Sequence, residues 1–96
     1  MSKFIVRVQL SVSTNNMYTM LRDRLIKIGF TKRIKSREGI EYRLPNGNYY
    51  IESSSNIDTI IAAVKKIALG IDKTPMVLVT EVLPKDGMTW FGLERC

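Results

Sequence analysis

The residues of this chain that could carry chemistry are mainly basic. Seven lysines and arginines lie between positions 22 and 37, namely Arg22, Arg24, Lys27, Lys32, Arg33, Lys35 and Arg37. Clustered guanidinium and ammonium groups bind the phosphates of nucleic acids. The cluster therefore predicts a positively charged ridge for RNA, although an ordinary solvated surface has the same composition.

Residues for other kinds of site are scarce. The chain has no histidine, which is the commonest general base and nitrogen ligand of metals, and its only cysteine is Cys96. Its nine acidic residues are scattered, and its glycines form neither a dinucleotide-binding nor a phosphate-binding loop. We therefore expect no metal and no cofactor, and most hydrolase mechanisms are disfavoured.

Length and charge set further limits. The 96 residues predict one domain, residues 1–96, and the formal net charge of +6 favours an acidic partner. No stretch is apolar and long enough to span a bilayer, and the lone cysteine fits a reducing compartment. We therefore expect a cytoplasmic protein with no membrane partner.

The part of the chain before the basic cluster predicts a strand and then a helix. Residues 3–12 alternate between apolar and polar side chains, as in a half-buried strand. Polar residues at 13–16 can cap a helix that ends at Gly29. The apolar residues at helical spacing are Met17, Leu21, Leu25 and Ile28, with Met20 beside them. The basic cluster begins on the outer side of this helix.

The second half of the chain repeats this order. A helix begins near Ser55, whose hydroxyl can cap it, and ends at Gly70. Its buried face is expected to hold Ile57, Ile60 or Ile61, Val64, Ile67 and Ala68. Residues 76–83 are apolar and β-branched enough for a central or near-central strand. The tail at 84–96 contains Trp90 and Phe91, so we expect it to pack on the domain or on a second copy.

The middle of the chain contains three extended segments, at 31–35, 40–44 and 48–53, and two turn signals between them. If both turns reversed the chain, the last segment would run the wrong way for a split β-α-β sheet. We predict a reversal at residues 36–39 and a bulge at residues 45–47 within one long strand. Pro-Asn-Gly is, however, the stronger turn signal in isolation.

Together these elements predict an α+β fold with the order β-α-β-β-α-β. This is the ferredoxin-like sandwich, in which two helices cover one face of a four-stranded antiparallel sheet. The open face is expected to show Ile5, Arg7, Arg33, Lys35, Arg43, Tyr50 and Val79, or their neighbours. Mixed apolar and charged residues on an open face also favour a homodimer.

The residues expected to bind RNA come from both the ridge and the open face: Arg7, Arg24, Lys32, Arg33, Lys35, Arg43 and Tyr50. An RNA-recognition module would place several aromatic residues on its central strands, whereas Tyr50 stands nearly alone here. Contact with the phosphate backbone is therefore favoured over the stacking of bases.

Five short strings carry a family resemblance. They are 4–8 (FIVRV), 29–32 (GFxK), 42–45 (YRLP), 77–81 (VLVTE) and 89–93 (TWxGL). On these strings, which cover nearly the whole chain, the sequence resembles the GhoS-like family of small bacterial endoribonuclease antitoxins of type V toxin–antitoxin systems. The resemblance implies a ferredoxin-like fold, similar to the small CRISPR spacer-acquisition nuclease, and cleavage of single-stranded toxin mRNA.

The resemblance also implies a catalytic residue. An arginine of the first helix matters for cleavage in that family, and Arg22 occupies the corresponding place. The CRISPR relatives have an aspartate at the end of the first strand, where this chain has Ser11, Val12 and Ser13. That difference argues against metal-dependent hydrolysis. A metal-free ribonuclease can use the 2′-hydroxyl of RNA as nucleophile, with Tyr18 or a carboxylate as candidate base.

Three functions remain open from the sequence. The first is an antitoxin-like endoribonuclease, which the resemblance and the basic ridge favour. The second is a non-catalytic nucleic-acid-binding regulator, favoured by the positive charge and the missing base. The third is a dimeric protein-interaction module, favoured by Trp90 and Phe91 in a polar tail.

Overall fold

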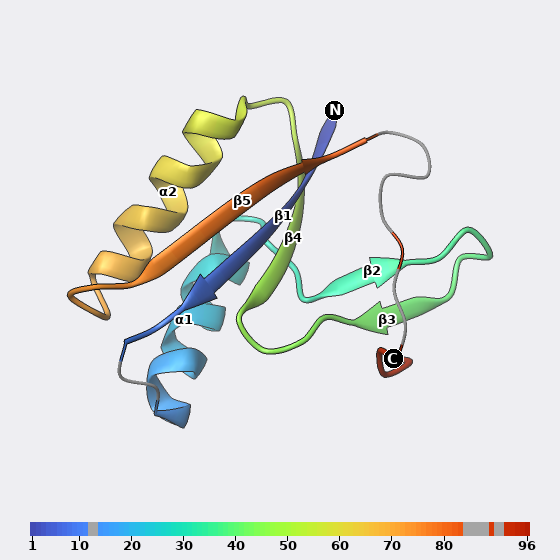
Figure 1. Ribbon diagram of the computed structural model, residues 1–96. Coiled ribbons are helices and arrows are strands. Elements are labelled where there is room, and N and C mark those ends of the chain that lie inside the picture. The colour runs from blue at the N-terminus through green and yellow to red at the C-terminus, as the bar shows by residue number, and fades with distance from the viewer. Residues whose placement is uncertain (12–13, 84–88, 90–91) are drawn as a thin grey trace.

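The computed structural model of the protein describes residues 1–11, 14–83, 89 and 92–96 (Figure 1). In chain order the elements are β1 (Ser2–Gln9), α1 (Asn15–Lys27), β2 (Arg33–Lys35), β3 (Glu41–Arg43), β4 (Asn48–Ser53), α2 (Ile57–Leu69) and β5 (Met76–Val82). The predicted α+β class is confirmed.

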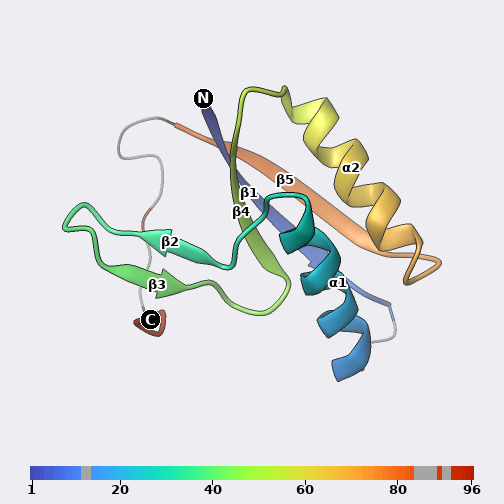
Figure 2. The same ribbon diagram turned by 180° about the vertical axis from the view of Figure 1, so that it is seen from behind.

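The main sheet has β1 at its centre, between β4 and β5, and both pairings are antiparallel. The alternating sequence of β1 sends Phe4, Val6 and Val8 to one face, where all three are buried. Both helices cover this face (Figure 2). From the helices the core receives Leu21, Leu25, Ile60, Val64 and Ala68. No helix or strand of the described residues covers the opposite face of the sheet, which we call the open face.

The predicted four-stranded sheet is wrong. In the described part of the chain the main sheet has three strands, and β2 pairs with β3 in a separate two-stranded sheet. Thr31, two residues before β2, still pairs with Tyr50 of β4, but the carbonyl of Lys32 already accepts from the amide of Leu44, at 2.7 Å. Residues 45–49 project between these two pairs. They divide the expected long strand into β3 and β4, and the β2–β3 hairpin protrudes as a result (Figure 1).

The predicted chain directions at the two turns in the middle of the chain are confirmed, but the predicted single long strand around residues 45–47 is wrong, because β3 and β4 are separate strands. The chain reverses between β2 and β3, where the amide of Gly39 donates to the carbonyl of Ser36 at 3.0 Å. At residues 45–47 it keeps its direction, because β4 and β3 both run antiparallel to the β2 segment. Pro-Asn-Gly does form a tight turn, with Asn48 donating to the carbonyl of Pro45 at 3.1 Å, but the turn lies inside the bulge.

The helix ends agree with the sequence except at one cap. Thr14 caps α1 by accepting from the amide of Met17, and Gly29 follows the helix at a φ of 111°. The cap of α2 is Asn56 and not Ser55. The carboxamide oxygen of Asn56 accepts from the amide of Thr59 at 2.9 Å, whereas Ser55 belongs to the preceding turn, where its amide donates to Ser53.

Several apolar side chains differ from their predicted positions. Met20, Ile28 and Ile57 are 42%, 48% and 38% exposed because they lie beside the narrow stripe that each helix buries. Val79 pairs with Val6 and so faces the helices, which leaves its neighbour Leu78 on the open face. Residues 76–82 form an edge strand, not a central one.

Two sets of long-range hydrogen bonds hold the segment after β1 and the C-terminal residues against the rest of the chain. The amide and hydroxyl of Ser11 both donate to the carboxylate of Asp72, at 2.6 and 2.7 Å, and these bonds lower the pKa of Asp72. Next to β3, Glu94 accepts from the amide of Arg43 at 2.8 Å, and Cys96 donates to the carbonyl of Glu41 at 3.0 Å. The predicted packing of residues 90 and 91 lies outside the described residues. In the described ranges no helix has the length and apolarity to cross a bilayer.

Candidate nucleic-acid interface

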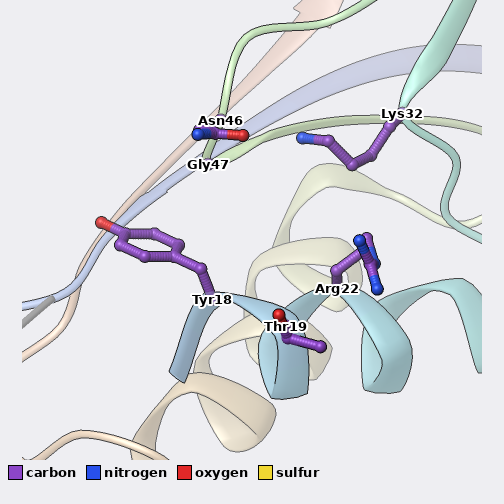
Figure 3. A pocket seen from close by; sticks show the side chains of 6 residues that line it. All are labelled: Tyr18, Thr19, Arg22, Lys32, Asn46 and Gly47. Carbon is purple, nitrogen blue, oxygen red and sulfur yellow. The ribbon is translucent and has the colours of Figure 1, made fainter. Parts of the chain in front are cut away.

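A cleft lies between α1 and the bulge that follows β3 (Figure 3). Its volume is about 210 Å³. The residues that line it are Tyr18, Thr19 and Arg22 from α1, and Lys32, Asn46 and Gly47 from the segments facing α1. Two of the predicted site residues, Arg22 and Lys32, therefore meet here although ten positions separate them in the sequence.

The wall of the cleft is built on Gly47. Its φ is +81°, and a Cβ at this position would lie 2.6 Å from the carbonyl oxygen of Val8. The same close approach allows the amide of Val8 to donate to the carbonyl of Gly47 at 2.7 Å. Only glycine combines this backbone conformation with so short a distance to a neighbouring strand. The bulge is thus fixed to the end of β1.

Lys32 holds the bulge from the other side. Its ammonium group donates to the carbonyls of Pro45 and Asn48, both at 3.2 Å, and lies 4.6 Å from the centre of the Tyr49 ring. Partial burial lowers the pKa of Lys32, and the nearby charges of Arg22 and Arg43 lower it further. A charged ammonium group that donates to two carbonyls still has a further N–H for a phosphate oxygen.

Arg22 is the second cation of the cleft. Its side chain is 47% exposed, and its guanidinium contacts the carboxylate of Asp23 at 3.3 Å. Asp23 is itself 65% exposed, and exposed ion pairs of this kind contribute less than about 1 kcal/mol. A phosphate, which a guanidinium binds with two parallel hydrogen bonds, can therefore replace Asp23 at Arg22.

The tyrosines of this region are not placed as bases. The hydroxyl oxygen of Tyr18 accepts from the amide of Leu10 at 3.2 Å, and Figure 3 shows it pointing away from Arg22 and Lys32. Burial raises the pKa of Tyr49 to about 12, so this phenol stays protonated near neutral pH. The ring of Tyr18 still forms a fixed wall of the cleft.

Arg24 lies away from the cleft although it is only two residues from Arg22. A Cβ on Gly70 would be 3.4 Å from a terminal nitrogen of Arg24, so this guanidinium lies beside the carboxyl end of α2. The carbonyls at a helix C-terminus carry partial negative charge, which stabilises a cation there. Arg24 therefore does not line the cleft with Arg22.

The basic residues of the hairpin share its exposed side. Arg33 and Arg43 pair across the strands, and each contacts a carboxylate: Arg33 contacts Glu41 at 3.4 Å and Arg43 contacts Glu94 at 3.5 Å. Lys35 is exposed on the same side. Arg43 is close enough to Lys32 to affect its pKa, so the hairpin adds positive potential at the edge of the cleft.

Arg7 and Tyr50 lie on the open face of the main sheet. Arg7 is exposed between Asn48 and Leu78, its partners in the adjacent strands. The hydroxyl of Tyr50 donates to Glu52 at 2.8 Å, and partial burial together with that carboxylate raises the pKa of Tyr50. The predicted set is thus divided among the cleft, the hairpin, the open face and the end of α2.

Sequence reasoning missed Thr19, Asn46 and Gly47. Thr19 had a detectable signal, because it is one helical turn from Arg22 and so shares its side of α1. Asn46 and Gly47 join the cleft only because residues 45–49 bulge toward α1, and that direction is set by the contact of Gly47 with Val8. No pattern within the segment itself encodes this contact.

Two further observations bear on the type of site. Within the ranges that the structure describes, no three histidine, cysteine, aspartate or glutamate side chains are grouped as metal ligands would be. The sequence matches no defined protein family and no curated protein significantly. The family resemblance noted from the short strings therefore stays a prediction.

Proposed function

We propose that this protein binds single-stranded RNA in the cytoplasm and seats a backbone phosphate in the cleft between α1 and the bulge. The observation that carries the proposal is the meeting of Arg22 and Lys32 from separate elements. The acceptors of Lys32 are neutral carbonyls, and the carboxylate at Arg22 is an exposed neighbour on the same helix. The cleft therefore combines two cations with weak internal neutralisation.

Burial adds to the attraction for phosphate. Lys32 loses part of its hydration in the cleft and is repelled by Arg22 and Arg43, which together lower its pKa. An anion between these groups would offset both effects. The volume of about 210 Å³ is below the roughly 300 Å³ at which ligand pockets begin, so the cleft suits a phosphate and part of a ribose.

The resemblance and the chain topology support a related proposal about the fold. A strand, a helix and a strand occur twice, with β1 central and both helices on one face. We interpret the molecule as a ferredoxin-like sandwich in which the second strand has left the sheet to form the hairpin. The cleft then lies where that strand leaves the sheet.

The RNA proposal is tested by binding of a labelled single-stranded RNA at several salt concentrations. We expect the affinity of the wild type to fall as salt rises, because phosphate contacts release counterions. Arg22→Ala should weaken binding about tenfold and reduce the salt slope by about 1. Arg24→Ala is the matched control, since Arg24 lies on the same helix but beside Gly70. Equal losses of RNA affinity in the two variants would refute the cleft as the binding site. An RNA affinity that does not depend on salt would refute RNA binding through phosphate contacts.

A second candidate function is metal-independent cleavage of the bound strand, as the antitoxin resemblance implies. Lys32 supplies the specific observation in its favour, because its charged ammonium group lines the same cleft as Arg22 and can give a proton to a leaving oxygen. In this reaction the 2′-oxygen attacks phosphorus and gives its proton to a base. The 5′-oxygen leaves and takes up a proton from the ammonium group of Lys32, which produces a 2′,3′-cyclic phosphate, while Arg22 stabilises the charge on the phosphoryl oxygens.

Cleavage is separated from binding by Lys32→Arg. Arginine keeps the positive charge but is too weak an acid to give a proton to the leaving oxygen. We expect RNA binding to persist and cleavage in the presence of a chelator to fall about 100-fold or more. A single 2′-deoxy nucleotide at the cut site should block cleavage of that bond by the wild type. If RNA stays intact after incubation with the purified wild type, the proposal that the protein cleaves RNA is refuted, whereas the proposal that it binds RNA still stands.

A further inference from the structure

The strand β5 has the composition of an internal strand but lies at the edge of the sheet. Its sequence, MVLVTEV, contains one charged residue, Glu81, and no proline. Edge strands in natural proteins usually carry lysine, proline or a bulge that discourages pairing with another chain. The β2–β3 hairpin has such protection, with Arg33, Lys35 and Glu41 on its exposed side.

The side chains of β5 are less covered than their counterparts in β1. Val79 and Val77 face the helices opposite Val6 and Val8, which are 0% and 2% exposed, yet both residues of β5 remain partly exposed. On the open face Met76 and Leu78 are 60% and 62% exposed. Both faces of β5 therefore have apolar surface that a further strand beside it would cover.

The backbone of β5 is also incompletely paired. In an antiparallel pair, alternate residues direct their N–H and C=O groups toward the partner, and the remaining residues direct theirs outward. Within the described ranges β5 has one strand neighbour, β1, and its outward groups have no backbone partner outside that pairing. This row of donors and acceptors is a template for another strand.

From these observations we propose that β5 pairs antiparallel with β5 of a second copy of this chain, joining two three-stranded sheets into one of six strands. If the two-fold axis passes beside Val79, the side chains of the two β5 strands are compatible with one another. This axis places Leu78 beside Thr80 of the second copy and Met76 beside Val82 of the second copy, so apolar groups adjoin across the interface. Glu81 falls opposite Val77, and the two Glu81 side chains stay apart.

The proposed β5–β5 pairing forms a closed dimer with a small interface. A two-fold contact uses the same edge of both copies, so assembly stops at the dimer and leaves both clefts free. One pair of strands with its flanking side chains buries less than the roughly 1,200 Å² of a standard interface. We therefore expect a reversible dimer that forms with rising concentration. The inference does not depend on the RNA proposal.

The test is the molar mass of RNA-free protein by sedimentation equilibrium over a range of concentrations up to millimolar. We expect a monomer–dimer equilibrium that Leu78→Lys shifts toward monomer, with a dissociation constant about tenfold or more above that of the wild type. Ile26→Lys is the matched control, because Ile26 is 48% exposed on α1, away from β5. Thr80→Lys provides a second disruptive variant on the same face should Leu78→Lys fold poorly.

Hydrogen exchange locates the contact independently. The amide protons of residues 76–82 should exchange more slowly as concentration rises, whereas those of the β2–β3 hairpin should not change. A monomer at every concentration would overturn the proposal and would mean that β5 is free or serves a different partner. Dimers that survive both lysine variants, or assembly beyond the dimer, would overturn it as well.

Discussion

The turn at the tip of the hairpin and the turn in the bulge have similar backbones and different surroundings. Gly39 and Gly47 both have a φ of +81°, and each turn is closed by a backbone hydrogen bond. A Cβ on Gly39 would meet nothing within 4 Å, whereas a Cβ on Gly47 would lie 2.6 Å from the carbonyl oxygen of Val8. The same local conformation therefore occurs in a turn without close neighbours at Gly39 and in a turn packed against β1 at Gly47.

The charges near the two turns differ in the same way. Lys32, beside the bulge, is partly buried and bonded to carbonyls. Arg33, the next residue, is 63% exposed and contacts Glu41 across the hairpin. Adjacent basic residues thus have unlike roles, because one points into packed structure and the other into water.

Substitution of the two glycines should give the largest contrast. Gly39→Ala should cost about 1 kcal/mol of unfolding free energy, because its only penalty is the left-handed backbone. Gly47→Ala should cost about 3 kcal/mol, because the new methyl group also has to displace the backbone of β1. Urea denaturation of both variants measures the difference. Equal losses would show that the bulge does not rest on Val8.

Lys32 and Lys35 should differ by a smaller amount. Lys32→Met removes the donor for two bulge carbonyls and should cost about 2 kcal/mol. Lys35→Met alters an exposed side chain of the hairpin and should stay within about 0.5 kcal/mol of the wild type. The same denaturation experiment applies. A Lys32→Met protein as stable as Lys35→Met would mean that water replaces the ammonium group without loss.

The pKa of Lys32 reports the proximity of Arg22. In the folded protein this pKa lies below its usual 10.5, so the folded state binds fewer protons than the unfolded state between the two values. The unfolding free energy should therefore rise with pH as 10.5 is approached, and this rise should be absent in Lys32→Met. Arg22→Ala should raise the pKa, and Arg24→Ala should leave it unchanged, as measured by NMR titration of the lysine side chain.

The ion pair of the hairpin should give the smallest effect. Glu41→Gln removes the carboxylate that Arg33 contacts at 3.4 Å, but the pair is largely exposed. We expect a loss of no more than about 0.5 kcal/mol, declining further with added salt. A loss comparable to that of Lys32→Met would show that the ion pair between Arg33 and Glu41 is not screened by solvent.

The periodic parts of the fold were accessible from the sequence. Alternation in β1, the helical stripe of Leu21 and Leu25, and the end of α1 at Gly29 each follow from local spacing and were predicted correctly. The reversal at residues 36–39 was inferred from the direction that the later strand must have. Local propensity and strand polarity sufficed for these elements.

Local spacing did not predict the number of strands in the main sheet or which of the basic residues lie together in the cleft. The fourth strand is lost because Lys32 pairs with Leu44 instead of extending the contact of Thr31 with Tyr50. This choice depends on how far residues 45–49 protrude, which is decided by packing against β1. Arg22 and Arg24 were predicted to act together, but residues two positions apart on a helix project to roughly opposite sides, so one lines the cleft and the other lies beside the end of α2.

The central position of β1 has a consequence for synthesis. Phe4 pairs with Ile51 on one side and Glu81 on the other, so neither neighbour exists when the first strand leaves the ribosome. Contacts so distant along a chain make folding slow and leave apolar segments uncovered in the meantime. The growing polypeptide must therefore keep its first strand soluble until most of its length has been made.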